Sequence, residues 1–356
     1  MAEGVRVFAI SIVISIILGT GELASILLIV ALTLFYTFEG GMTAVIWTDV
    51  VQMFLYIAGA IVSLFVILQL VPGGVPHILE SANAANKLRI FDFRFDFSAE
   101  FFSRPYSFWA GLIGGAFLTT ASHGTEQLMV QRLLAGRSEA ESRLALFGSW
   151  FVIFFQFTLF LLIGLILYVY YQDTGKTPPA ISDRIYPQFI WDHLPVGVAG
   201  LVIAAILAAA MSNLSAALNS LASTTVMDFV KPLSKASRSE REYLRLSKWI
   251  TVLWGLILFA IALIAQNVKS VLESGLSIAS IIYGGLLGVF LLGVLTRRVG
   301  ERAAMVGMSL GLIANLYVKF GTNIAWTWYV LIGSAVTVGS ALLFSLIVKE
   351  DTLANA

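Results

Sequence analysis

The chain of 356 residues is strongly apolar, with 58% hydrophobic residues, 12% charged residues and a mean hydropathy of +0.89. A soluble domain of this size carries about a quarter charged residues, so this chain has too little polar surface to face water on all sides. The net charge of +1 gives no field that would attract nucleic acid. The sequence has no cysteine, which excludes disulfides, thiolate metal sites and cysteine nucleophiles.

Apolar segments long enough to cross a bilayer recur along the whole chain. A hydrocarbon core about 30 Å thick is crossed by ~20 helical residues. Ten segments are predicted as spans: 3–19, 22–38, 48–70, 106–125, 144–171, 198–226, 247–266, 272–295, 303–319 and 327–348. The first two are short and meet at Gly19–Glu22, so a single bent helix remains an alternative to two spans. The expected fold is an all-α, polytopic membrane helix bundle, with 1–356 as a single membrane domain.

The distribution of Lys and Arg predicts which side of the membrane each connection occupies. Cytoplasmic connections of membrane proteins hold the excess of these residues. With both termini inside, the inner connections hold twelve Lys and Arg and the outer connections hold eight. Four of the eight lie in the long connection 71–105, and long connections count less. We expect a multi-pass protein of the plasma (inner) membrane with both termini cytoplasmic.

The long connection, 71–105, is expected to be extracytoplasmic and contains an alternating run, Phe91 to Phe97, in which Phe alternates with Asp and Arg. An extended segment with this pattern has one aromatic face and one charged face. It could cover the outer surface at the level of the lipid headgroups, or it could close over a substrate.

Polar residues inside apolar segments are costly unless they line a cavity or find a partner, so they indicate where function lies. Within 208–220, Ser212, Ser215 and Asn219 lie on one side of the expected helix. Hydroxyl and carbonyl oxygens suit a dehydrated sodium ion. A seam of small residues whose hydroxyls bond to carbonyls one turn earlier would explain the same pattern.

Two further segments carry polar residues at depth. His123 and Glu126 are spaced i, i+3 and share a face, which is typical of a substrate contact, a proton relay or a satisfied pair near the cytoplasmic surface. Ser277, Ser280 and Gly284 share one face of 272–295, which favours either a helix that can unwind or close packing.

The residues at the start of the third segment predict a helix–turn–helix, and this structural role explains them without a catalytic or binding function. Gly40 and Gly41 permit a sharp reversal, and Thr48 then caps a new helix. Asp49 follows in the first turn, where the positive end of the helix favours a carboxylate.

Three ordered motifs resemble those of the sodium:solute symporter family. The run Tyr36–Asp49 resembles its YT..GGM.AV.WTD signature, Gln131–Ala135 resembles its QR.LA segment, and Ala208–Ser223 resembles its AA.MS..S..LNS.AS segment. The resemblance implies the leucine-transporter architecture, with two inverted five-helix repeats, broken helices and a central site.

The resemblance also implies site residues. In this family a sodium ion lies between the first core helix and the helix with the MS motif, so its ligands here would be the Ala209 carbonyl and the Ser212 hydroxyl. Asn213 stands where the family usually has Ser or Thr, and its amide oxygen could substitute. The expected substrate contacts are Thr119, Ser122, His123, Ser277 and Ser280. The aromatic gate of the sugar-transporting members is missing near His123, so a sugar is not supported.

Family members usually carry about three further N-terminal helices, including one that completes the sodium site. The chain is therefore expected to be an N-terminally truncated copy, whose missing helices would act as a partner. Residues 1–70 would be a remnant of the first repeat, 106–295 the second repeat, and 296–356 C-terminal accessory helices.

The expected function is sodium-coupled symport of a small organic solute by alternating access, with sodium bound and transported. The partners would be the solute and the lipid bilayer, and no nucleic acid. Two other classes remain open. One is a non-transporting accessory or regulatory membrane module. The other is a membrane-embedded enzyme, for which only His123 and Glu126 resemble a catalytic set.

Overall fold

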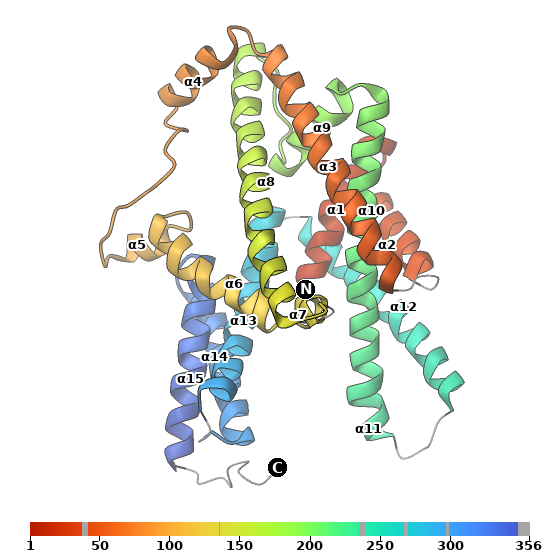
Figure 1. The fold of residues 1–356 in the computed structure, drawn as a ribbon, viewed down its shortest axis with the longest axis vertical. Helices are drawn as coiled ribbons and strands as arrows, with labels where there is room; N and C mark the ends of the chain where they lie inside the picture. The colour runs from red at the N-terminus through yellow and green to blue at the C-terminus, as the bar shows by residue number, and fades with distance from the viewer. Residues whose placement is uncertain (38–41, 135, 235–238, 267–269, 297–298, 348–356) are drawn as a thin grey trace. The chain divides into compact units, whose positions relative to one another are not determined.

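The computed structural model describes residues 1–356 apart from 38–41, 135, 235–238, 267–269, 297–298 and 348–356. The side chains of 36, 42–48, 127–128 and 131–132 are also not described. All regular elements in the described part are helical (Figure 1). The chain forms two compact units. Unit 1 comprises Met1–Leu88 and Phe151–Gly275, and unit 2 comprises Arg89–Trp150 and Leu276–Ala356.

Most of the described elements belong entirely to one unit, whereas α8 (Glu139–Thr174) and α13 (Val271–Leu295) contribute to both. The elements of unit 1 are α1 (Ala2–Leu18), α2 (Glu22–Thr37), α3 (Met42–Leu70), α4 (Gly74–Ala84), η2 (Ser182–Arg184), α9 (Ile185–His193), α10 (Val196–Thr224), η3 (Thr225–Val230), α11 (Lys231–Leu233) and α12 (Glu240–Ala265). The elements of unit 2 are α5 (Ala99–Ser103), η1 (Ala110–Gly114), α6 (Gly115–Gly124), α7 (Gln127–Leu134), α14 (Glu301–Gly321), η4 (Trp326–Trp328) and α15 (Tyr329–Ile347).

Seven described helices are long and apolar enough to cross a membrane, and up to eight if a bent pair forms one span. The seven are Asp49–Leu70, Glu139–Thr174, Val196–Leu233, Glu240–Ala265, Val271–Leu295, Glu301–Gly321 and Trp326–Ile347. This confirms a multi-pass helical bundle, although ten spans were predicted. The three segments that do not qualify alone are the first two and 106–125.

The bend between the first two segments has a local cause. α1 ends at Gly19, whose φ of 61° lies in the left-handed region that glycine adopts without steric cost. Ala2–Leu18 and Glu22–Phe35 then meet at 111°, and only the pair together is long enough to cross. Neither helix is a span by itself, and the bent pair is either a broken span or a re-entrant loop.

The segment 106–125 is interrupted in a different way. Its first part is a π-helix, η1, and its second part is the α-helix α6, which ends at Gly124. They cover 5 and 10 residues, and Phe108 and Trp109 before them are also helical, so this segment reaches only the lower end of the length that a bilayer needs.

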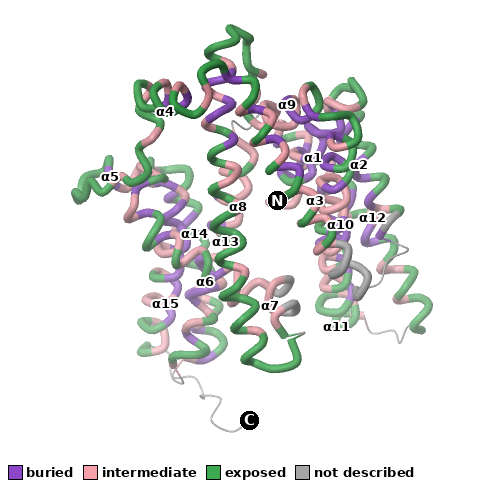
Figure 2. Tube along the Cα trace, turned by 45° about the horizontal axis from the view of Figure 1, so that its top comes forward, coloured by how far each residue is buried: buried purple, intermediate pink, exposed green. Residues whose placement is uncertain are grey.

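Unit 1 is organised around α10, which packs against α1, α2, α3 and α12. Buried residues run along α1 and α10 (Figure 2). Small residues allow these helices to approach closely: a Cβ added to Gly4 of α1 would lie 2.6 Å from Cβ of Ile261 on α12. Helices in a membrane associate through such packing, because lipid tails remove the hydrophobic driving force.

Unit 2 contains a similar seam, in which α13, α14 and α15 meet. Asn315 on α14 is fully buried, and its Nδ2 donates to the Ile281 carbonyl at 2.9 Å. A Cβ added to Gly284 would lie 2.7 Å from Asn315 Nδ2 and 2.9 Å from Cα of Gly333. Glycine at 284 thus makes room for the amide of the neighbouring helix.

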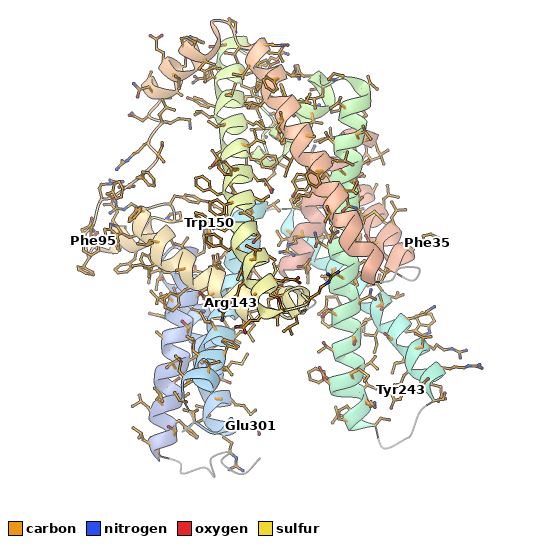
Figure 3. The ribbon with its side chains drawn as sticks, in the orientation of Figure 1. Phe35, Phe95, Arg143, Trp150, Tyr243 and Glu301 are labelled. Carbon is orange, nitrogen blue, oxygen red and sulfur yellow. The ribbon has the colours of Figure 1, made fainter. Side chains whose placement is uncertain are left out.

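The long connection contains α4, which the sequence pattern did not predict, and an extended stretch that it did. Asp92 accepts from Arg94 Nε at 2.9 Å and from Arg89 at 2.8 Å, and the Arg94 guanidinium holds the pKa of Asp92 well below its usual range. The phenylalanines of the run pack on one another and on Phe108 and Trp109 (Phe95 is labelled in Figure 3). The aromatic and charged faces therefore separate as the alternation predicted.

We predict that Gly284→Ala destabilises the protein by about 1–3 kcal/mol, because the added methyl group meets Asn315 and Gly333 in a packed seam. The matched control is Gly293→Ala on the same helix, where an added Cβ meets nothing within 4 Å. That change should be neutral or stabilise by about 0.5–1 kcal/mol. Thermal unfolding of both variants in detergent measures the difference, and equal melting temperatures would refute this account of the seam.

Candidate functional site

A carboxylate and a hydroxyl meet inside unit 1. The Ser212 hydroxyl on α10 donates to Oδ1 of Asp49 on α3 at 2.9 Å, and Ser212 is only 3% exposed. Asp49 lies in α3, in the part that is long and apolar enough to cross a membrane. The oxygen atoms of a carboxylate inside an apolar bundle can balance the charge of a cation as well as accept a hydrogen bond.

A second pair of hydroxyls lies one turn further along α10. Thr37 of α2 donates to the Thr33 carbonyl at 2.6 Å, and its Oγ1 lies 3.0 Å from Oγ of Ser215. The Thr33 hydroxyl is buried without a partner among the described residues. We call Thr33, Thr37, Asp49, Ser212 and Ser215 the hydroxyl cluster. Most of these oxygens are buried in an apolar bundle, where unmet polar groups are costly.

The predicted sodium ligands lie along one turn of α10, and one of them, Ser212, belongs to this cluster. Asn213 is exposed, and its Nδ2 donates to the Ala209 carbonyl at 3.1 Å. The nitrogen of the Asn213 amide, not its oxygen, therefore contacts that carbonyl. Ser212 turns instead toward Asp49, which the sequence pattern had assigned to a helix start. The predicted reversal at Gly40–Gly41 lies outside the described residues. The prediction that Thr48 caps a new helix was wrong, because α3 begins at Met42 and Thr48 lies inside it.

The substrate residues predicted on α6 satisfy one another within a single turn. Ser122 Oγ lies 2.9 Å from His123 Nδ1, and these two atoms lie 3.2 and 3.1 Å from the Thr119 carbonyl. Glu126 accepts a hydrogen bond of 2.6 Å from the Tyr283 hydroxyl on α13. Among the contacts of the described residues, Glu126 is therefore bonded to Tyr283 rather than to its i, i−3 neighbour His123.

The two serines predicted on α13 are both buried in unit 2. Ser277 Oγ accepts from Nζ of Lys319 on α14 at 3.0 Å. Ser280 is 1% exposed, and its hydroxyl has no partner in the described part of the chain. α6 meets α13 through Ala121, which packs against Leu287. The structure thus brings the α6 residues together locally, and it adds Tyr283 and Lys319, whose partners are far away in sequence.

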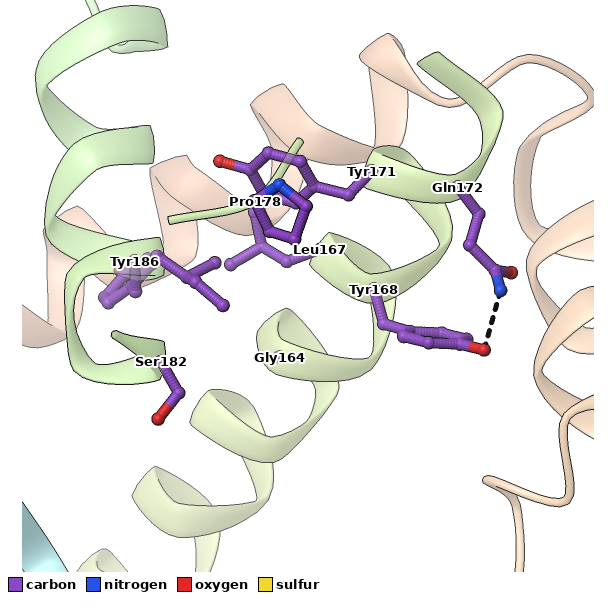
Figure 4. Close-up of a pocket in the computed structure, with 9 residues that line it drawn as sticks. Gly164, Leu167, Tyr168, Tyr171, Gln172, Pro178, Ser182 and Tyr186 are labelled. Atoms are coloured by element: carbon purple, nitrogen blue, oxygen red, sulfur yellow. Dashed lines mark hydrogen bonds between the residues drawn. The ribbon is translucent and has the colours of Figure 1, made fainter. Parts of the chain in front are cut away.

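A cavity of about 380 Å³ in unit 1 lies apart from every predicted residue (Figure 4). Its wall includes three tyrosines, Tyr168, Tyr171 and Tyr186. Two of the three phenol groups already have partners: Gln172 Nε2 donates to the Tyr168 oxygen at 2.7 Å, and Tyr186 donates to Ser63 Oγ at 3.1 Å. The sequence did not predict this cavity, because its lining residues form no recognisable motif.

The helices and their internal polar clusters define a multi-pass α-helical membrane protein that keeps carboxylate and hydroxyl groups inside its bundle. The model of the sodium:solute symporter family matches residues 3–311. The chain belongs to this family, as its three motifs predicted.

The chain is similar to the sodium/sialic acid symporter SiaT of Proteus mirabilis, with 31% identity over 329 residues that cover 89% of this chain and 64% of the relative. It is 29% identical over 334 residues to the human sodium-coupled monocarboxylate transporter 1, covering 90% of this chain and 52% of that protein. The chain thus spans about half to two thirds of the length of these relatives.

The fold is similar to that of a solved structure, the substrate-bound outward-open state of a Na⁺-coupled sialic acid symporter. The TM-score is 0.81 at 28% identity, and the match covers 99% of this chain and 73% of that chain. The expected all-α transporter fold is therefore confirmed. The division into two repeats stays a prediction, because the compact units are defined by contacts and a repeat is defined by symmetry.

We predict that Asp49 and Ser212 are energetically coupled. A hydrogen bond to a charged group contributes about 1.5–3 kcal/mol, so Asp49→Asn and Ser212→Ala should be non-additive by about this amount in the free energy of unfolding. The matched cycle pairs Asp49→Asn with Asn219→Ala, an exposed residue two turns further along α10. Additivity in both cycles would contradict the Asp49–Ser212 contact.

Proposed function

We propose that this protein carries out sodium-coupled symport of a small solute by alternating access. The observation that supports it best is the contact of Ser212 with Asp49 inside unit 1, in a chain of the sodium:solute symporter family. The relatives named above are sodium-coupled transporters, and sodium is the ion that we propose to be bound and transported here.

The proposed sodium site combines the predicted ligands with Asp49. Hard cations prefer oxygen ligands, and here the Ala209 carbonyl, the Ser212 hydroxyl and the Asp49 carboxylate can offer them. In the absence of sodium, the Ser212 proton occupies one carboxylate oxygen. When sodium binds, Ser212 can rotate its proton away and present a lone pair, while the carboxylate compensates the positive charge in a medium of low dielectric constant. The Asn213 amide would contribute only after turning its oxygen toward the ion.

The proposed solute contacts are Thr119, Ser122 and His123 on α6 with Ser277 and Ser280 on α13. The names of the relatives specify sialic acid and monocarboxylates, which are carboxylate anions, and also iodide. The Lys319 ammonium beside Ser277 is a cation that an anionic solute could approach. We therefore propose a small organic anion as the solute.

Coupling would follow from a shift in conformational population. Sodium can drive solute binding only if it binds one conformation more tightly than the other, and the solute must favour the same conformation. We propose the plasma membrane as the location and a cytoplasmic position for both termini, in line with the excess of Lys and Arg in the connections assigned to the inside. A role as a transporter, and not as an enzyme, fits the family.

The test is uptake of radiolabelled sialic acid and lactate into proteoliposomes with and without a sodium gradient. It uses this chain and a fusion that adds the part of the Proteus mirabilis symporter outside the match. We expect sodium-dependent uptake that falls at least about tenfold in both variants. Asp49→Asn removes the negative charge that balances the ion, and Ser212→Ala removes a hydroxyl ligand. The matched control, Asn219→Ala, should keep wild-type uptake.

The outcomes separate the candidate functions. Uptake by the fusion that is lost in Asp49→Asn supports symport, whether or not the chain alone is active. If neither protein moves any solute of an extended panel with sodium, the symport proposal fails. An accessory role in the membrane would then take its place.

A further inference from the structure

One face of α12 changes from basic to apolar along the helix. Residues three or four positions apart share a face, so the face that begins at Arg241 contains, in order, Arg241, Arg245, Lys248, Val252, Leu256, Phe259 and Leu263. The first three residues are positively charged, and all three are exposed. The four residues after them are apolar. We call Arg241, Arg245 and Lys248 the basic stripe.

Contacts on another face hold α12 in unit 1. Ile250 is buried beside Val226 of η3, and Tyr243 packs against them (Tyr243 is labelled in Figure 3). Trp254 Nε1 also donates to Oγ1 of Thr225 at 3.0 Å. Because these contacts fix the rotation of the helix about its axis, the basic stripe is held on the exposed side of α12.

The carboxylates at the start of α12 do not compensate the two arginines of the basic stripe. Glu242 accepts from the Ser239 amide at 2.7 Å and from Ser239 Oγ at 2.9 Å, in a capping box. Glu240 directly precedes Arg241, and adjacent residues point to different sides of a helix. Among the described residues, neither Arg241 nor Arg245 forms an ion pair.

Arginines in the predicted outer connections differ in this respect. Each of the four lies within 3.1 Å of a carboxylate: Arg89, Arg94, Arg104 and Arg184. Their charges are therefore balanced within the chain. The charges of Arg241 and Arg245 are not, so they can attract a negatively charged partner from outside the chain.

The order of residues along this face indicates that the partner is a lipid. α12 is long and apolar enough to cross a membrane, so the change between Lys248 and Val252 is expected where headgroups give way to hydrocarbon. Trp249 lies at the same level and is 68% exposed, as is typical of tryptophan at a membrane interface. A soluble anion would need the charges alone, whereas a phospholipid also matches the apolar continuation of the face.

We propose that the basic stripe binds the phosphate of an anionic phospholipid, whose acyl chain lies along Val252, Leu256 and Phe259. Arginine suits this contact because its guanidinium can donate two parallel hydrogen bonds to phosphate. Phosphatidylcholine is disfavoured, because its choline group brings a positive charge close to the arginines. The connection before α12 is among those predicted to be cytoplasmic, and the cytoplasmic leaflet carries the anionic lipids.

The experiment measures how brominated lipids quench Trp249 fluorescence after reconstitution of the chain into phosphatidylcholine vesicles. The Trp249 signal is the difference between each protein and the same protein with Trp249→Phe. At equal mole fractions, we expect brominated phosphatidylglycerol to associate at least about tenfold more strongly than brominated phosphatidylcholine. Arg241→Gln and Arg245→Gln should each lower this preference about two- to fivefold, and the double variant should lower it further.

The matched control is Arg143→Gln, an exposed arginine that is paired with Glu139 at 2.6 Å, and it should keep the wild-type preference at Trp249. Replacing both stripe arginines with lysine keeps the charge and should retain the preference to within about twofold of the wild type. This variant also shows whether a loss in the glutamine variants comes from charge rather than from misfolding.

Three results would overturn the proposal. The first is equal quenching by the two lipids in the wild type, or an unchanged preference in the double glutamine variant. The second is no quenching of Trp249 by either lipid, because protein and not lipid would then cover this face. The third is loss of the preference when inorganic phosphate is added at the concentration of the phosphatidylglycerol, because the site would then bind phosphate without a lipid.

Discussion

A hydrocarbon interior offers no water to a polar group, and the arrangement of this protein depends on that constraint. In unit 1 the Asp49 carboxylate accepts from Ser212, and Thr37 lies within hydrogen-bonding distance of Ser215. In unit 2 the Glu126 carboxylate accepts from Tyr283, and Ser277 accepts from Lys319. Three of these contacts join two different helices, and the contact of Glu126 joins α13 to the residues between α6 and α7. Polar groups inside the bundle therefore determine which helices are neighbours. The apolar residues around them are less selective, because an apolar side chain can face lipid as well as another helix.

The same constraint explains why glycine is so frequent where these helices meet. A polar side chain can cross to a neighbouring helix only if the backbones come close, and the buried Asn315 reaches the Ile281 carbonyl beside Gly284 and Gly333. Packing through small residues also replaces the hydrophobic driving force that lipid removes. The glycines at 111 and 115 differ from those at 284 and 333, because they face open space rather than a neighbouring helix.

The fold class, and which residues share a face of one helix, could be predicted from the sequence. Which residues of different helices contact each other could not. Hydropathy predicted the long spans because length and apolar composition are properties of one segment. It overcounted where a backbone bends, as at Gly19, or where a π-helix interrupts the segment before Gly115. For the candidate site, spacing placed Ser212 and Ser215 on one face, but Asp49 was read as part of a helix start. The partner of Glu126 is Tyr283, 157 residues away, which no local pattern contains.

The proposed coupling has a physical consequence for the two units. The residues proposed for sodium belong to unit 1, and those proposed for the solute belong to unit 2. A ligand shifts a conformational equilibrium only by its difference in affinity between two states, so sodium in one unit affects the solute in the other only if both units change with the same transition. Among the described helices, α8 and α13 contribute to both units, and α13 also carries Ser277 and Ser280. Under this proposal, α13 is the element through which a change in one unit would reach the solute contacts of the other, and its buried serines are the groups that would respond.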